Sequence, residues 1–144
     1  MKRFLYIISA LMLLVSCGDK GDWRPTLTLE QKLCTEWHST NLSLDADIYI
    51  SFADNGTFEL YQKIVEGAYR LYRGTWNLEE DLLTGKYNDG EDWAAAYKVA
   101  IVNNVLTLTS YNDTAEESVF EKSEVPAEVK GNCVTIVKSS TRAF

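Results

Sequence analysis

Few side chains in this 144-residue sequence have the types and spacing that catalysis or metal binding requires. His38 is its single histidine, and no group of Cys, His or carboxylates has the spacing of a zinc site. The acidic run at 88–92 lacks the alternating ligands and distal Glu of a calcium loop, so it is interpreted as a charged turn. The Gly-x-Ser-x-Gly elbow of many serine hydrolases is also missing. We therefore predict a protein that is not an enzyme, with no catalytic residue, metal or cofactor, and with His38 facing outward.

Cys17 has the most definite predicted chemistry. The sequence begins with Met1-Lys2-Arg3, and a mostly apolar run at 4–15 follows, which is too short to span a bilayer as a helix of about 20 residues. A basic start before a short apolar run is typical of a secretory signal. The run ends in Leu14-Val15-Ser16-Cys17, which resembles a lipobox, where a small residue precedes the Cys that receives a diacylglyceryl thioether.

The lipobox resemblance implies cleavage after a signal peptide at 1–16 and acylation of Cys17 by chains such as palmitate. Two or more chains give stable anchoring. We expect a lipoprotein of the Gram-negative cell envelope, held in the outer membrane by lipid on Cys17. Residues 17–27 are expected to be the lipidated Cys and a flexible tether. The alternative is an ordinary cleaved signal followed by a chance Cys.

The charge of the chain restricts its partners. Without Lys2 and Arg3, 12 basic and 21 acidic residues give the mature chain a formal charge of −9. Nucleic-acid binding, which needs clustered Lys and Arg, is not expected. Attraction of the protein itself to anionic headgroups is not expected either, so the lipid is the predicted membrane partner. We expect a monomer of one domain.

The mature chain is built from short alternating runs separated by turns. Thr28 and Gln31 have the spacing of a capping box, which predicts a short helix at Leu29–Leu33. From Trp37 onward we predict about eight strands, including 48–52, 57–62, 69–78, 82–87, 93–102, 105–110 and 119–122. We thus expect an all-β domain at 28–138, an antiparallel up-and-down barrel whose closure removes exposed edges. A short helix from Pro126, a further strand at 133–138 and a frayed tail at 139–144 complete the expectation.

Two stretches resemble small lipocalin-like lipoproteins of Gram-negative bacteria. Residues 33–37 look like the Gly-x-Trp opening of that family, with Thr35 in place of the Gly. Further similarity lies in Gly74-Thr75-Trp76-Asn77-Leu78, in 83–87, Trp93, Tyr97 and 106–109, and in Val125-Pro126-Ala127-Glu128-Val129. The resemblance spans about 33–130 and implies a lipocalin-like antiparallel barrel. Many members of the family have no established activity.

Five residues are candidates for ligand binding: Trp37, Arg70, Tyr72, Trp76 and Tyr97. If Trp76 points into the barrel, Tyr72 and Arg70 on the same face of the strand also point inward. With Tyr97 they would line an open mouth that has apolar walls and a few polar anchors, as small-molecule sites prefer. In the alternative, the rings fill the barrel and Arg70 lies at its rim in solvent.

Two cysteines remain once Cys17 is acylated. In an oxidising compartment Cys34 and Cys133 can form one disulfide, which would close a loop of roughly 100 residues and contribute about 4–5 kcal/mol in the chain-entropy model. Two separate thiols are the alternative, and the sequence does not choose between them.

Two functions follow from this reading. The first is a lipid-anchored lipocalin-like protein of the cell envelope that binds or carries a small, partly apolar molecule. The alternative is a non-enzymatic surface interaction module with a solid barrel, whose loops bind a protein or a glycan. A cavity of about 300 Å³ or more that is open to solvent favours the first. A barrel filled by aromatic rings favours the second.

Overall fold

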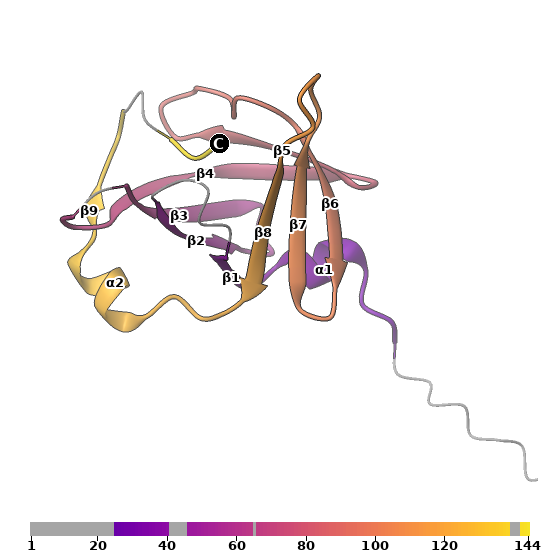
Figure 1. Cartoon of the computed structure of the whole chain (residues 1–144), viewed down its shortest axis with the longest axis horizontal. Coiled ribbons are helices and arrows are strands. Elements are labelled where there is room, and N and C mark those ends of the chain that lie inside the picture. Colours follow the sequence, from indigo (N-terminus) through magenta and orange to yellow (C-terminus); the bar gives the residue numbers. More distant parts are fainter. Residues whose placement is uncertain (1–24, 41–45, 65, 139–141) are drawn as a thin grey trace, which may run out of the picture.

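The strands of the chain close into an antiparallel barrel (Figure 1). The structure, a computed structural model, describes residues 25–40, 46–64, 66–138 and 142–144. The predicted signal peptide, Cys17 and the tether up to residue 24 lie outside the described residues. In chain order the elements are α1 (Leu29–Leu33), β1 (Glu36–Ser39), β2 (Asp47–Phe52), β3 (Thr57–Lys63), β4 (Arg70–Glu79), β5 (Leu82–Tyr87), β6 (Tyr97–Val102), β7 (Val105–Ser110), β8 (Glu117–Lys122), α2 (Ala127–Asn132) and β9 (Val134–Thr135).

In the described part of the chain, each strand from β1 to β8 pairs antiparallel with the next, and β8 pairs with β1 to complete the ring. The predicted eight-stranded up-and-down barrel with a short amino-terminal helix is confirmed. β9, within the run where a further strand was predicted, pairs parallel with the start of β4. Alternation along the strands sends apolar side chains inward, as in β2, where Ile48, Ile50 and Phe52 are buried.

One end of the barrel is closed by α1, and we call it the closed end. The predicted capping box is present: the Thr28 hydroxyl accepts from the Gln31 N–H at 3.2 Å, and the Gln31 side chain accepts from the Thr28 N–H at 3.0 Å. Leu33, at the end of the helix, is fully buried, and its carbonyl accepts the indole N–H of Trp37 at 3.0 Å. The other end carries the connections at 64–69, 88–96 and 111–116, and we call it the open end.

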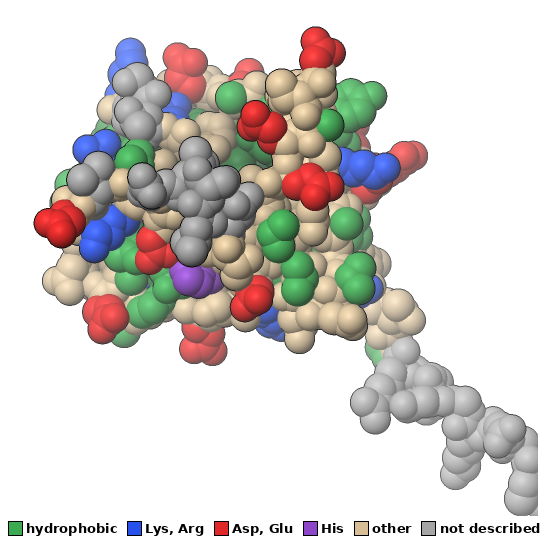
Figure 2. All heavy atoms as spheres, in the orientation of Figure 1, with side chains coloured by type: hydrophobic (Ala, Val, Ile, Leu, Met, Phe, Trp, Pro, Cys, Tyr) green, Lys and Arg blue, Asp and Glu red, His purple; other side chains and the backbone are tan. Residues whose placement is uncertain are grey.

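A second, smaller apolar cluster lies on the outer face of the barrel under α2. Val125 and Val129 pack there against Tyr61 and Leu71 of β3 and β4. Glu36 of β1 fastens this layer, because its carboxylate accepts the Val125 N–H at 2.6 Å and pairs with Lys130 at 2.6 Å. On the molecular surface (Figure 2), Asp and Glu side chains are spread over the visible face with Lys and Arg between them.

The strand predicted at 93–102 begins four residues later than expected. β6 starts at Tyr97 and pairs with β5 at only two positions, Leu82↔Lys98 and Leu83↔Tyr97. Trp93 lies instead in the 88–96 connection, where its backbone N–H donates to the Gly85 carbonyl at 2.9 Å. Its indole lies directly on Gly85, so that a Cβ at this position would overlap the ring. The absence of a side chain at Gly85 is therefore what lets Trp93 cover the short β5–β6 seam.

Among the described residues, Cys34 and Cys133 are separate thiols, the arrangement given above as the alternative to a disulfide. The reason is that they belong to different packing layers. Cys34 ends α1 and packs against the barrel core, whereas Cys133 ends α2 and packs in the outer cluster.

The expectation of a frayed tail at 139–144 fails for its last residues. Phe144 is only 6% exposed and belongs to the main core cluster. The yellow carboxy-terminal segment in Figure 1 returns to the barrel strands rather than extending into solvent. Residues 139–141 lie outside the described residues.

Candidate functional site

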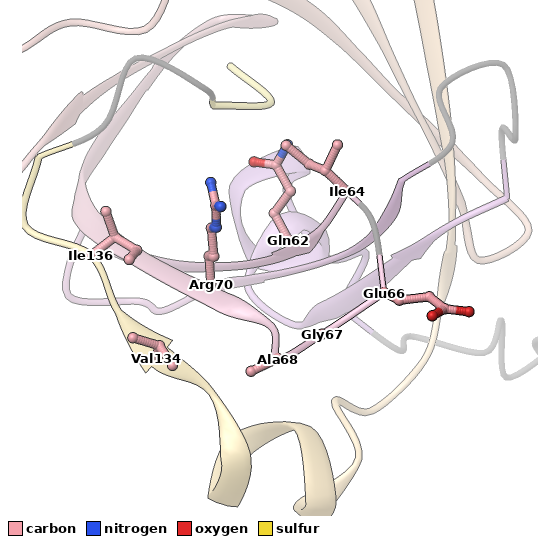
Figure 3. A pocket seen from close by; sticks show the side chains of 8 residues that line it. All are labelled: Gln62, Ile64, Glu66, Gly67, Ala68, Arg70, Val134 and Ile136. Atoms are coloured by element: carbon pink, nitrogen blue, oxygen red, sulfur yellow. The ribbon is translucent and has the colours of Figure 1, made fainter.

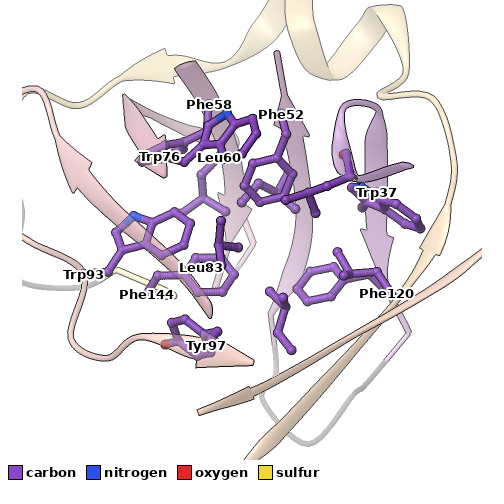
Figure 4. Close-up of a cluster of buried hydrophobic side chains, with 14 of the residues drawn as sticks. Trp37, Phe52, Phe58, Leu60, Trp76, Leu83, Trp93, Tyr97, Phe120 and Phe144 are labelled. Carbon is purple, nitrogen blue, oxygen red and sulfur yellow. Dashed lines mark hydrogen bonds between the residues drawn. The ribbon is translucent and has the colours of Figure 1, made fainter. Parts of the chain in front are cut away.

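The closed half of the barrel interior is filled by aromatic rings (Figure 4). Trp37, Phe58 and Phe120 are each 1% exposed. Trp76 is anchored as well, because its indole N–H lies 2.9 Å from the Thr57 carbonyl and 3.2 Å from that of Ala53. Trp37 and Trp76 therefore belong to the packed core, as the alternative interpretation of these residues predicted.

The open half of the interior is occupied by the carboxy-terminal segment Arg142–Phe144. The ring of Phe144 stacks on Trp93, with centroids 4.9 Å apart, and meets the edge of Tyr97 at 5.3 Å. A third ring, Phe120, lies 6.4 Å away. The hydroxyl of Tyr87 donates to the Phe144 carbonyl at 2.9 Å. Burial in this aromatic setting raises the pKa of Tyr87, so the phenol stays neutral and keeps its donor.

Arg142 adds a cationic contact to the same segment. Its guanidinium lies over the ring of Tyr87, 4.0 Å from the centroid, with Tyr72 at 6.0 Å. It also hydrogen-bonds and pairs with Asp89, and both side chains are less than a tenth exposed. This hydrogen bond holds the pKa of the Asp89 carboxyl below its usual range, which keeps the carboxylate charged.

A pocket of about 440 Å³ lies at the open end (Figure 3). Gln62 of β3 and Arg70 of β4 are paired across the two strands, and their side chains extend in the same direction from the barrel wall. Ile136 faces them from the segment after β9, whereas Glu66 points away. The lining residues are Gln62, Ile64, Glu66, Gly67, Ala68, Arg70, Val134 and Ile136. The pocket is thus lined by polar and apolar groups in similar measure, and its polar side chains are one amide, one guanidinium and the carboxylate of Glu66.

Three buried polar atoms around the open end have no hydrogen-bond partner among the described residues: Gln62 Oε1, Trp93 Nε1 and Arg142 Nε. Buried polar groups of native proteins are rarely left unpaired, and each such atom calls for an explanation, such as a ligand or an ordered water. Gln62, 4% exposed, lines the pocket, and Trp93 and Arg142 flank the carboxy-terminal segment. The open end is therefore the part of the barrel best equipped to hold a further molecule.

His38 lies on the outer face, as predicted. Its ring stacks on that of Tyr49, with centroids 4.2 Å apart, and its Nε2 is 2.6 Å from Asp47 Oδ1. The other carboxylate oxygen of Asp47, Oδ2, accepts a hydrogen bond from the Tyr69 hydroxyl. These hydrogen bonds hold the pKa of Asp47 low despite its partial burial, and burial raises that of Tyr69. The cluster ties β1, β2 and the start of β4 together.

Neither a metal centre nor a membrane-crossing helix is found in the described ranges. No group of three or more Cys, His, Asp or Glu side chains could hold a metal ion there. Likewise, none of the helices within those ranges is long and apolar enough to cross a bilayer.

Comparison with known families agrees with this architecture. A family model described as a lipocalin-like domain matches residues 20–108, which is more than half of the chain. The chain belongs to the lipocalin-like domain family. No curated protein matches this lipocalin-like chain. Among solved structures, it is similar to the NMR structure of a protein from Bacteroides uniformis ATCC 8492, with a TM-score of 0.51 and 19% identity over 65% of this chain and 90% of that one. At that identity the likeness concerns the fold, and family and barrel together fit a ligand-binding protein.

The predicted ligand-binding residues of the lipocalin-like barrel separate into two groups. Trp37 and Trp76 pack in the closed half, away from the pocket. Arg70 lines the pocket, and Tyr72 and Tyr97 contact the carboxy-terminal segment. Arg70, Tyr72 and Trp76 share the inner face of β4, whereas Leu71 between them packs in the outer cluster. Their roles in binding stay predictions.

Sequence reasoning missed the residues that complete the open end of this lipocalin-like barrel. Asp89 was assigned to a solvated turn, but Arg142 buries it. Trp93 was placed in a strand, and Phe144 in a frayed tail. One signal pointed to the tail: Arg142 and Phe144 are large side chains in a run otherwise made of Ser, Thr and Ala.

Proposed function

We propose that this protein is a lipid-anchored binding protein of the Gram-negative cell envelope, which takes a small, partly apolar molecule at the open end of its barrel. The observation that carries the proposal is the pocket of about 440 Å³ beside Gln62 and Arg70. Its volume lies within the range of small-molecule sites, and its lining offers polar and apolar groups in similar measure.

The two polar anchors are available to a ligand. Gln62 Oε1 is buried without a hydrogen-bond partner among the described residues, so a donor group on a ligand would satisfy it. Arg70 has no ion pair with another described residue, and its guanidinium can bind a carboxylate or phosphate through two parallel hydrogen bonds. A molecule with an apolar body and an anionic or carbonyl end suits this arrangement.

The filled closed half supports a second candidate, the solid-barrel interaction module. With Trp37, Trp76, Phe58 and Phe120 packed together, a ligand has no deep cavity in that half. A module of this kind would bind a protein or glycan through its loops and would need neither Gln62 nor Arg70. The two candidates therefore differ in what Arg70 does.

Native mass spectrometry of the purified protein tests the choice. A small molecule retained by the wild type and lost from Arg70→Ala supports the binding function. Arg73→Ala is the matched control, since Arg73 is another exposed arginine of the same strand but lies outside the pocket and is paired with Glu59 at 2.8 Å. If no small molecule is retained, or if both variants retain it equally, the pocket is not the binding site.

The anchoring part of the proposal rests on Cys17 in its lipobox-like setting. Replacement by Cys17→Ser should move the protein from the membrane fraction to the soluble fraction, because the domain carries net negative charge and has no other predicted attraction to anionic lipid. Retention of the variant in the membrane fraction would contradict lipid anchoring and leave the pocket proposal unaffected.

A further inference from the structure

The open half of the barrel makes side-chain contacts with residues 142–144 that resemble those of a receptor with a short peptide. Phe144 enters an aromatic enclosure formed by Trp93, Tyr97 and Phe120. Two positions earlier, Arg142 lies on Tyr87 and pairs with Asp89. The 88–96 connection supplies Trp93 to the enclosure and Asp89 to the cation site, and three strands supply Tyr87, Tyr97 and Phe120. The barrel therefore contacts both ends of a three-residue stretch.

Each contact belongs to a known mode of ligand recognition. Offset-stacked and edge-to-face aromatic pairs contribute beyond their buried area, and a guanidinium over an aromatic ring is attracted by the ring quadrupole. Asp89 supplies the charge that a cationic ligand group needs, and its exposure of 8% strengthens the attraction relative to a surface pair. Tyr87 adds a donor for a backbone carbonyl.

Residues 142–144 are attached to the barrel in a way that would let an external ligand replace them. Residues 142–144 belong to no strand, whereas the preceding β9 pairs with β4 through its backbone. Two buried polar atoms at the contact, Arg142 Nε and Trp93 Nε1, have no partner among the described residues. An unpaired buried polar group is unfavourable, so the segment fits its site imperfectly. A ligand that satisfies these groups would compete with it.

We propose that the open half of the barrel is a binding site for peptide-like ligands that carry a guanidinium or similar cation and an aromatic ring two residues apart, and that Arg142–Phe144 is its built-in occupant. The inference rests on the proposed function, because it takes the open end as the place of binding, and it adds a ligand class for the interior next to the pocket. A tethered occupant acts at an effective concentration in the millimolar range, so an external ligand must displace it.

The test uses the full chain and a peptide of residues 140–144, Ser-Thr-Arg-Ala-Phe, with both ends blocked. In the double variant Arg142→Ala/Phe144→Ala, which no longer fills its own site, we expect 1:1 binding by calorimetry and a change in tryptophan fluorescence. The wild type should bind the same peptide at least about tenfold more weakly. Peptides in which the Arg or the Phe is replaced by Ala should also lose about tenfold or more in affinity for the double variant.

Arg73→Ala serves as the matched control, because it removes an exposed arginine of β4 outside the site. Its affinity for the peptide should be as low as that of the wild type. The proposal is overturned by a folded double variant that does not bind the peptide, by equal binding to wild type and variant, or by equal binding of the Ala-substituted peptides. If the double variant does not fold, the same titration is made with Phe144→Ala. Failure of both to fold would show that the segment is obligatory core, which also overturns the proposal.

These outcomes are separable from the proposed function. An Arg70-dependent small molecule found by native mass spectrometry, together with no peptide binding, removes only the peptide inference. Absence of both removes the open end as a binding site.

Discussion

The ring of Phe144 stacks on the indole of Trp93 with the two planes inclined by 26°, and the same indole lies against Gly85 of β5. A strand glycine, a loop tryptophan and a carboxy-terminal phenylalanine thus form one stack at the seam between β5 and β6. The seam has only two paired positions, so this stack stabilises the part of the wall where backbone hydrogen bonds are fewest.

Gly85→Ala should disturb this stack. The added Cβ overlaps the Trp93 ring, which cannot withdraw freely because Phe58, Tyr97 and Phe144 surround it. Overpacking of this kind lowers the free energy of unfolding by about 1–3 kcal/mol. Urea denaturation followed by tryptophan fluorescence measures the loss. Gly131→Ala in α2 is the control, since a Cβ there meets nothing within 4 Å and should leave stability equal or slightly higher. Equal effects of the two variants would contradict the stack.

Phe144→Ala should lower the free energy of unfolding less than a core Phe replacement does. Phe120→Ala, within β8, is expected to lose about 3–5 kcal/mol, as is usual for a buried ring. If the carboxy-terminal segment opens locally, removing the Phe144 ring loses only the local contact, about 2 kcal/mol or less. Thermal and urea denaturation of both variants provides the comparison. A loss for Phe144→Ala as large as that for Phe120→Ala would indicate that the segment unfolds only with the whole barrel.

The Asp89–Arg142 pair should make the attachment of the segment pH-dependent. Arg142 lowers the pKa of Asp89 in the folded state, so the pair contributes fully above the unfolded value of about 3.9 and is lost as pH falls through the lower folded value. Acidification below about pH 4 should therefore release the segment, with a change in Trp93 fluorescence. Asp89→Asn should show the released spectrum already at neutral pH.

Asp92→Asn is the control for this titration. Asp92 lies in the same connection, but its side chain is 75% exposed and its pair with Lys86 is at the surface. The variant should keep the wild-type pH profile, because exposed ion pairs contribute little. An unchanged profile in Asp89→Asn as well would show that the Asp89–Arg142 pair does not hold the segment.

The barrel could be predicted because its determinants are local in the sequence. Alternation in β2 and a turn at 54–56, where Gly56 has a φ of 78°, define the β2–β3 hairpin. Asn103 and Asn104 likewise take positive φ between β6 and β7. The bounds of β5 and β7 were predicted to the residue for the same reason.

The open end could not be predicted because its determinants are distant in the sequence. The alternation of 97–102 continues backward in apolar residues as far as Trp93, and only the surface of Gly85 draws that ring out of the strand. Phe144 follows a polar run that is typical of frayed ends, and its burial depends on rings from three other parts of the chain. Alternation does place Arg70 and Tyr72 on one face of β4, but it could not show that Tyr72 is buried whereas Arg70 is exposed at the barrel end.

Whether Cys34 and Cys133 form a disulfide depends on where they lie in the fold, which their spacing in the sequence does not show. With Cys34 in the barrel core layer and Cys133 in the outer cluster, both thiols should be free in the native protein. In a Cys17→Ser background, a thiol reagent at pH 8 should find two groups per chain. Burial raises the pKa of Cys34, and nearby Glu30 and Asp54 add to the shift, so little of this thiol is ionised at pH 8 and it should react slowly. Single Cys34→Ser and Cys133→Ser variants assign the two rates. Thiols that appear only after reduction would instead demonstrate a disulfide, and would require one of the two layers to rearrange.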